Sequence, residues 1–107
     1  MEKPDQNLFL AEMYEDDYYP KLLVDKIKAQ IERVAGFLEQ GECGLSEIKR
    51  KFDEMTMGIN GLQEEFEGHE SEIDAMARDS IEKTVSYIIE CFNLDIDVED
   101  AIAERDF

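Results

Sequence analysis

The stretch LSEIKRKFDEMTMGINGLQEEF, residues 45–66, decides the fold of this 107-residue chain. Its apolar residues recur every three or four positions, at Leu45, Ile48, Phe52, Met55, Ile59, Leu62 and Phe66. This heptad-type spacing keeps one apolar face along about 33 Å of helix. Gly58 and Gly61 each disfavour a helix by about 1 kcal/mol relative to alanine, and their spacing indicates a kink or a close contact with another helix. We expect one long helix here, with an irregularity at the two glycines.

A second amphipathic helix precedes this stretch. Its apolar positions lie three or four residues apart, at Leu23, Ile27, Ile31, Val34 and Leu38. Pro20 suits the first turn of a helix, where its missing N–H would have had no partner. We therefore expect this helix to begin near residue 20 and to end before Gly41.

A third long helix is expected after the stretch. Ser71-x-x-Asp74 resembles a capping box, in which the serine oxygen accepts a backbone N–H at the helix start. The apolar face behind it consists of Ile73, Ala77, Ile81, Val85, Ile88 and Phe92. Short helices are expected from Asn7 and after a cap at Asp97, and no segment has the period-2 pattern of a strand. The sequence thus predicts an all-α antiparallel helix bundle of three long helices plus short N- and C-terminal helices, in a single helical domain, residues 1–107.

Opposite charges four residues apart occur along these helices. The pairs are Glu47–Lys51, Arg50–Glu54, Asp74–Arg78 and Asp79–Lys83. This spacing places both members of a pair on one helix face. We expect them to form solvated surface pairs, each contributing a few tenths of a kcal/mol to stability.

Charge is unevenly distributed along the chain. The formal net charge is −17, from 28 acidic and 11 basic residues. Residues 52–107 hold 17 of the acidic residues and 3 of the basic ones, whereas residues 21–51 carry a small positive excess. A negative field repels nucleic acid and anionic lipid and attracts basic proteins or cations. The sequence therefore favours a basic protein partner and no nucleic acid, although acidic residues also serve solubility alone.

Signals for a membrane span or for secretion are missing from the sequence. There is no run of about 18 apolar residues, and the opening MEKPDQ lacks the basic and apolar regions of a secretory signal. We therefore expect no membrane contact and a cytoplasmic location. Cys43 and Cys91 have no metal-binding spacing, so both are expected to be thiols.

Residue patterns typical of catalytic and metal sites are scarce. The sequence has no Glu-x-x-His pair, no Gly-x-Ser-x-Gly and no glycine-rich phosphate loop. His69 is the only histidine, and it is expected in a solvated loop. The acids of residues 95–100 alternate like those of a calcium loop but lack the glycine at the sixth position. We predict no catalytic, cofactor or metal residue; the alternative is a carboxylate-based metal-binding protein or enzyme without a local motif, with Glu15, Asp16 and Asp17 as first candidates.

The segment EMYEDDYYPKLLVDKIK, residues 12–28, carries most of the candidate contact residues. Its three acids precede a predicted helix start, where negative charge contributes about 0.3–1 kcal/mol per group, so they have a structural explanation. The rings of Tyr14, Tyr18 and Tyr19 are expected either to anchor the loop or to contact a partner. The candidate partner contacts are Glu15, Asp16, Asp17, Tyr18, Tyr19, Glu64, Glu65 and Glu67.

Several segments of the chain resemble a family of small uncharacterised bacterial proteins, a domain of unknown function. They are EMYEDDYYPKLLVDKIK, LQEEFE followed by SEI and ARD, and the closing IAERDF. The resemblance covers most of the chain and is weakest over residues 39–58. It implies a stand-alone bacterial, cytoplasmic, helical protein, and it brings no activity, ligand or catalytic residue.

Taken together, these features favour a non-enzymatic acidic interaction protein of an immunity or regulatory type. Charge complementarity accelerates encounter, and a small acidic domain can cover a basic active site, as in the neutralisation of a toxin. The apolar face of residues 45–66 fits the core of a monomer, and it also fits pairing between two chains of a homodimer.

Overall fold

Every regular element in residues 3–41 and 43–107, the part of the chain that the computed structural model describes, is a helix. A 3-10 helix at Gln6–Leu8 precedes α1 (Ala11–Glu15), and the long helices are α2 (Lys21–Glu39), α3 (Leu45–Asn60) and α5 (Ala75–Cys91). Two short helices, α4 (Gln63–Gly68) and α6 (Val98–Ala101), follow α3 and α5 respectively. The all-helical prediction is confirmed.

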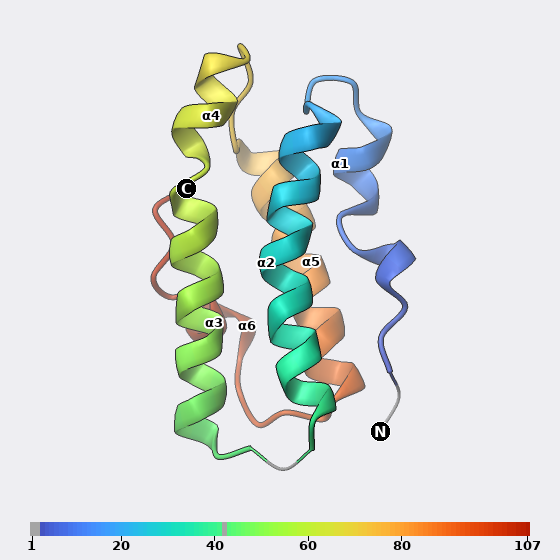
Figure 1. The fold of residues 1–107 in the computed structure, drawn as a ribbon, viewed down its shortest axis with the longest axis vertical. Coiled ribbons are helices and arrows are strands. Elements are labelled where there is room, and N and C mark those ends of the chain that lie inside the picture. The colour runs from blue at the N-terminus through green and yellow to red at the C-terminus, as the bar shows by residue number, and fades with distance from the viewer. Residues whose placement is uncertain (1–2, 42) are drawn as a thin grey trace.

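The long helices run along the long axis of the molecule, and α2 contacts α3 (Figure 1). The chain runs down along α2, up along α3 and down again along α5 (Figure 1). The short α1 contacts α5 and α2, while α6 contacts both α5 and α3. The upper end of the molecule in Figure 1 is formed by α4 and the loop between α1 and α2.

The core is built from the apolar positions that the helical spacing predicts. The buried positions of α2 include Leu23, Ile27, Ile31, Val34 and Leu38, and the whole apolar face of the third long helix is buried. In the stretch 45–66 every apolar position of the seam is buried except Leu45, which lies exposed at the first residue of α3. Because this face is buried in the chain's own core, it offers no apolar seam to a second copy.

The expectation of one long helix over residues 45–66 is wrong, because the helix breaks between Asn60 and Gln63. The Leu62 N–H donates to the Ile59 carbonyl at 2.9 Å, a tight turn that replaces one turn of α-helix. The turn keeps the helical phase, so Leu62 and Phe66 stay buried.

The two glycines near the break have different roles. A Cβ on Gly58 would lie 2.6 Å from the side-chain carbonyl carbon of Gln30 in α2, so this glycine permits a close contact between α2 and α3. Gly61 lies in the break itself, where it follows the last residue of α3. The sequence offered a kink or a close contact, and the structure contains both.

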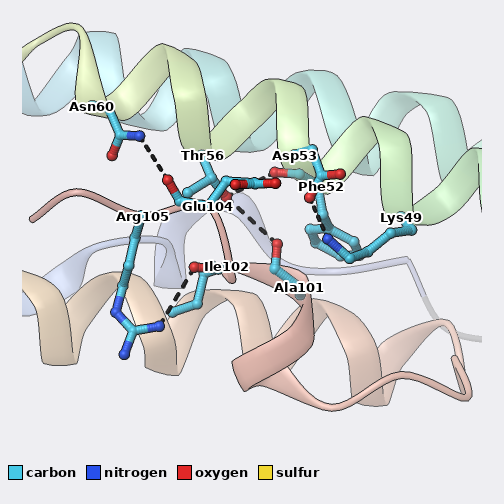
Figure 2. A network of polar contacts seen from close by, with 9 residues as sticks. All are labelled: Lys49, Phe52, Asp53, Thr56, Asn60, Ala101, Ile102, Glu104 and Arg105. Atoms are coloured by element: carbon cyan, nitrogen blue, oxygen red, sulfur yellow. Dashed lines mark hydrogen bonds and ion pairs between the residues drawn. The ribbon is translucent and has the colours of Figure 1, made fainter.

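Polar groups of α3 hold the C-terminal segment. The Asn60 side chain donates to the Glu104 carbonyl at 2.9 Å and accepts from the Asp106 N–H at 2.7 Å. One turn earlier, the buried Thr56 hydroxyl lies 3.5 Å from the Ala101 carbonyl. Figure 2 shows Thr56 and Asn60 reaching from α3 toward this segment. The closing residues are therefore part of the fold.

Helix starts differ in detail from the sequence predictions. Asp74 caps α5, because its carboxylate accepts the Ala77 N–H at 3.0 Å. Ser71 lies in the preceding loop, and its buried hydroxyl has no hydrogen-bond partner among residues 3–41 and 43–107. The predicted helix from Asn7 is a 3-10 turn capped by Asp5, and the α-helix starts only at Ala11. Asp97 stands at the N-cap position of α6, as predicted, but its side chain forms no capping hydrogen bond with the described residues.

Candidate functional site: an acidic groove between α1 and α5

Polar side chains on one face of α5 fasten the N-terminal segment in place. The Tyr87 hydroxyl accepts the Asp5 N–H at 2.8 Å, and the Thr84 hydroxyl accepts the Leu10 N–H at 3.0 Å. One turn further along, the Ser80 hydroxyl donates to Glu12 at 2.9 Å. The three α5 positions are three or four residues apart, so a single helix face holds the whole segment.

Leu10 shows how firmly this segment is fixed. Its φ of 57° lies in the left-handed region, which disfavours a side chain such as leucine by about 1–2 kcal/mol. The side chain is nevertheless fully buried, and the N–H has its partner in the buried Thr84 hydroxyl. Core packing and this bond compensate for the strain, and together they set where α1 begins.

Three adjoining cavities open along the line between α1 and α5, and Glu12 lines all three. We call them together the acidic groove. The largest, of about 750 Å³, lies over α5 and is lined by Glu12, Met76, Asp79, Ser80, Glu82, Lys83, Ser86, Tyr87, Glu90 and Val98. A second, of about 440 Å³, lies against Glu12, Glu15, Asp16, Asp17 and Met76, and a third, of about 280 Å³, includes Leu8 and Ala11.

The groove combines carboxylates with apolar surface. Met76 is 45% exposed, and Leu8 is also exposed. Around them, Asp79, Glu82 and Glu90 line the cavity from α5. Within the described part of the chain, none of these three acids forms an ion pair. The groove can therefore bind cationic and apolar groups at the same time.

Glu12 is the acidic residue of the groove that forms an ion pair within the protein. One carboxylate oxygen accepts from Ser80, and the other lies 2.9 Å from the Lys83 ammonium. The Lys83 hydrogen bond, aided by backbone and Ser80 bonds, lowers the pKa of Glu12 below its ordinary value. The predicted Asp79–Lys83 pair does not form, because Lys83 reaches across the groove to α1 instead. The other three predicted pairs are also not among the ion pairs of residues 3–41 and 43–107, where Lys49 pairs with Asp53 and Lys51 with Glu54.

The three acids after Tyr14 line the upper end of the groove. Glu15 and Asp17 are exposed, while the Asp16 carboxylate accepts the Tyr18 N–H at 2.9 Å and shapes the loop. All three precede the start of α2 at Lys21, and its first turn itself holds no acidic residue. Their stabilisation of that helix start stays a prediction. The structure thus places Glu15, Asp16 and Asp17 beside the same cavity.

The neighbouring tyrosines differ in exposure. Tyr19 is 1% exposed and donates a hydrogen bond to Asp74, so it anchors the loop to α5 and offers a partner no surface. Tyr18 is exposed and packs edge-on against it, with ring centroids 5.1 Å apart. Tyr14 donates to Asp25 at 2.6 Å. Burial and these carboxylates raise the pKa of Tyr14 and of Tyr19.

Glu64, Glu65 and Glu67 form a second acidic surface. All three are exposed on α4, at the same end of the molecule as the α1–α2 loop (Figure 1). Glu65 forms an ion pair with Lys26 of α2 at 2.7 Å. None of the three lines the acidic groove, so the candidate contacts divide into two sets.

The described residues contain no group of three or more histidine, cysteine, aspartate or glutamate side chains arranged to hold a metal ion. This includes Glu15, Asp16 and Asp17, although they share a cavity. His69 is exposed at the end of α4, and its Nδ1 lies 2.8 Å from the Glu65 carbonyl. In the part of the chain that the structure covers, no helix has the length and apolar character needed to cross a membrane.

Comparison with known proteins gives the family. The model of a family of unknown function, DUF5713, matches residues 3–107. The chain belongs to this family. No curated protein and no solved structure shows a significant match to it. DUF5713 membership confirms the predicted resemblance to a domain of unknown function. Because the function of the family is unknown, membership assigns no activity to the groove.

Sequence analysis did not identify the α5 side of the groove. The signal was present, since Asp79, Glu82, Ser86 and Glu90 follow one another at steps of three and four residues along one polar face. The spacing on α5 predicted its apolar face and two charge pairs, Asp74–Arg78 and Asp79–Lys83, but it did not indicate a binding surface. No sequence pattern indicated that Glu12 lines the groove, because this role depends on contacts with residues about 70 positions away, such as the hydrogen bond from Lys83.

Proposed function

We propose that this protein is a non-enzymatic interaction protein whose acidic groove binds a basic protein partner, in an immunity or regulatory role. The observation that carries the proposal is the groove itself, in which Asp79, Glu82 and Glu90 stand beside the exposed Met76. Interfaces gain specificity from complementary charge, and their affinity depends on buried apolar contacts. A groove with both properties fits a partner that is basic and has apolar side chains.

The helices that carry the groove support this role. The proposed bundle of α2, α3 and α5 holds a rigid surface, and the N-terminal segment is fixed on it by side chains of α5. A binding surface built on packed helices loses little entropy when a partner docks. The exposed acids of α4 extend the negative field beyond the groove and would steer a basic partner toward it.

Native mass spectrometry of the protein isolated from its own cells at moderate salt tests the proposal. We expect an added mass of protein size that belongs to a basic protein and that dissociates as the salt concentration rises. The same spectrum reports bound metal and self-association. A bare chain under all growth conditions, or a complex that is insensitive to salt, would contradict the proposal.

Charge-reversal variants locate the binding surface. Asp79→Lys combined with Glu90→Lys changes the groove, and Glu64→Lys combined with Glu67→Lys changes α4. Glu47→Lys is the control, because Glu47 is exposed on α3 and lines none of the cavities. We expect the groove variant to lose the partner, the α4 variant to bind it more slowly, and the control to keep it.

A further inference from the structure

Lys83 occupies a particular place in the acidic groove. Among the described residues that line the largest cavity, it is the only basic one. Its ammonium lies 2.9 Å from Glu12, and the side chains of Lys83 and Glu12 are 72% and 40% exposed. An ion pair this exposed to water contributes little to stability, so another cation can replace the lysine at small cost.

The shape of the groove limits what can replace it. The lining residues on α5 extend from Met76 to Glu90, which corresponds to about 21 Å of helix. Apolar groups of Met76 and Tyr87 on α5 and of Val98 on α6 line the same cavity as the carboxylates of α5. An amphipathic helix of a partner, with lysine or arginine on one face and aliphatic side chains on the next, matches this arrangement in length and charge.

We propose that the acidic groove binds a basic amphipathic helix of the partner, and that a lysine or arginine of that helix displaces Lys83 from Glu12. This inference rests on the proposed function and names the segment that the groove recognises. Lys83 is then an internal competitor, which occupies Glu12 until a partner with better apolar contacts arrives. A basic helix fits the acidic groove better than a second copy of this chain does, because two copies that each carry a net charge of −17 repel one another.

The test uses a fluorescently labelled peptide of about 14 residues, the helix length that spans the groove, built from lysine and leucine in amphipathic order. Binding is followed by fluorescence anisotropy at low salt. We expect Lys83→Gln to bind the peptide about two- to fivefold more tightly, as when one exposed ion pair no longer competes. Arg78→Gln is the matched control, since it also removes one positive charge from α5 but lines none of the cavities.

A double-mutant cycle separates competition from a simple change in net charge. If Lys83 competes for Glu12, Lys83→Gln gives no gain in affinity when Glu12→Gln is already present. Equal gains in both backgrounds, or an equal gain from Arg78→Gln, would show a general charge effect and would overturn the inference.

Two further ligands test the chemistry of the occupant. A lysine–serine peptide of equal charge should bind several-fold more weakly, because it has no aliphatic face. Equal binding of the two peptides, or full competition by spermidine at the peptide's own concentration, would overturn the inference in favour of a site for simple polyamines. If neither peptide binds, the inference fails, while a basic partner that native mass spectrometry recovers, and that the variant Asp79→Lys with Glu90→Lys loses, would still support the proposed function.

Discussion

Asp74 joins two parts of the molecule through a single carboxylate. It accepts the Ala77 N–H at the start of α5 and the hydroxyl of the buried Tyr19. The loop that carries the groove's upper acids is therefore tied to the helix that carries its lower acids. At the residue scale, this joint links the two sets of acids that line the groove.

Replacement of Asp74 tests this joint. Asp74→Ala should lower the free energy of unfolding by about 2–3 kcal/mol, because α5 loses its cap and the Tyr19 hydroxyl is left buried without a partner. Asp74→Asn keeps an acceptor and should cost clearly less. Urea unfolding followed by circular dichroism measures both. A loss below about 0.5 kcal/mol for the alanine variant would contradict the structure at this point.

Tyr14 and Tyr19 make the free energy of unfolding depend on pH in the alkaline range. The folded protein raises the pKa of Tyr14 and of Tyr19 above the ordinary value of 10.0, so folding favours their neutral form. This contribution is complete below pH 10 and is lost as the pH rises through the raised pKa values. We expect the free energy of unfolding to fall above about pH 10, and to fall less steeply in Tyr14→Phe and Tyr19→Phe. Urea unfolding across this pH range, with Tyr18→Phe as control, shows whether the slope changes.

At the element scale, the sequence predicted what depends on local periodicity. The buried faces of α2 and α5 follow from apolar residues three and four positions apart, since this spacing keeps them on one side of a helix. The spacing did not predict the break after Asn60. Leu62 and Phe66 are buried on the same side of the molecule with the break as they would be in a continuous helix, so the apolar pattern is the same in both cases. Asn60 in the segment I-N-G carried a turn signal, but its two partners lie over 40 residues away in the C-terminal segment.

Asn60, at the end of α3, should stabilise the C-terminal segment through its two hydrogen bonds. Asn60→Ala removes a donor to Glu104 and an acceptor for Asp106, and we expect a loss of about 1–2 kcal/mol in the free energy of unfolding. The amide of Asp106 should also exchange faster with solvent, as measured by nuclear magnetic resonance. Asn60→Asp keeps the acceptor and should leave the Asp106 amide protected. An unchanged exchange rate of the Asp106 amide in Asn60→Ala would show that the Asn60 side chain does not hold the C-terminal segment.

At the scale of the whole molecule, charge and shape act together. The negative field attracts basic proteins from a distance, and the acidic groove provides contacts at short range. Sequence analysis predicted the field from composition alone. It placed candidate contacts at Glu15, Asp16 and Asp17, which line the groove, and at Glu64, Glu65 and Glu67, which do not. The groove itself depends on how α1 lies against α5, which composition cannot give.

The methionines provide the most direct test of the groove as the binding surface. Met76 lies in the groove at 45% exposure, and Met57 lies on α3 at 62% exposure, outside all three cavities. With carbon-13 in the methionine methyl groups, nuclear magnetic resonance reports both sites in one spectrum. On addition of the partner recovered from the protein's own cells, we expect the Met76 signal to shift and the Met57 signal to stay. A shift at Met57 with none at Met76 would contradict the account.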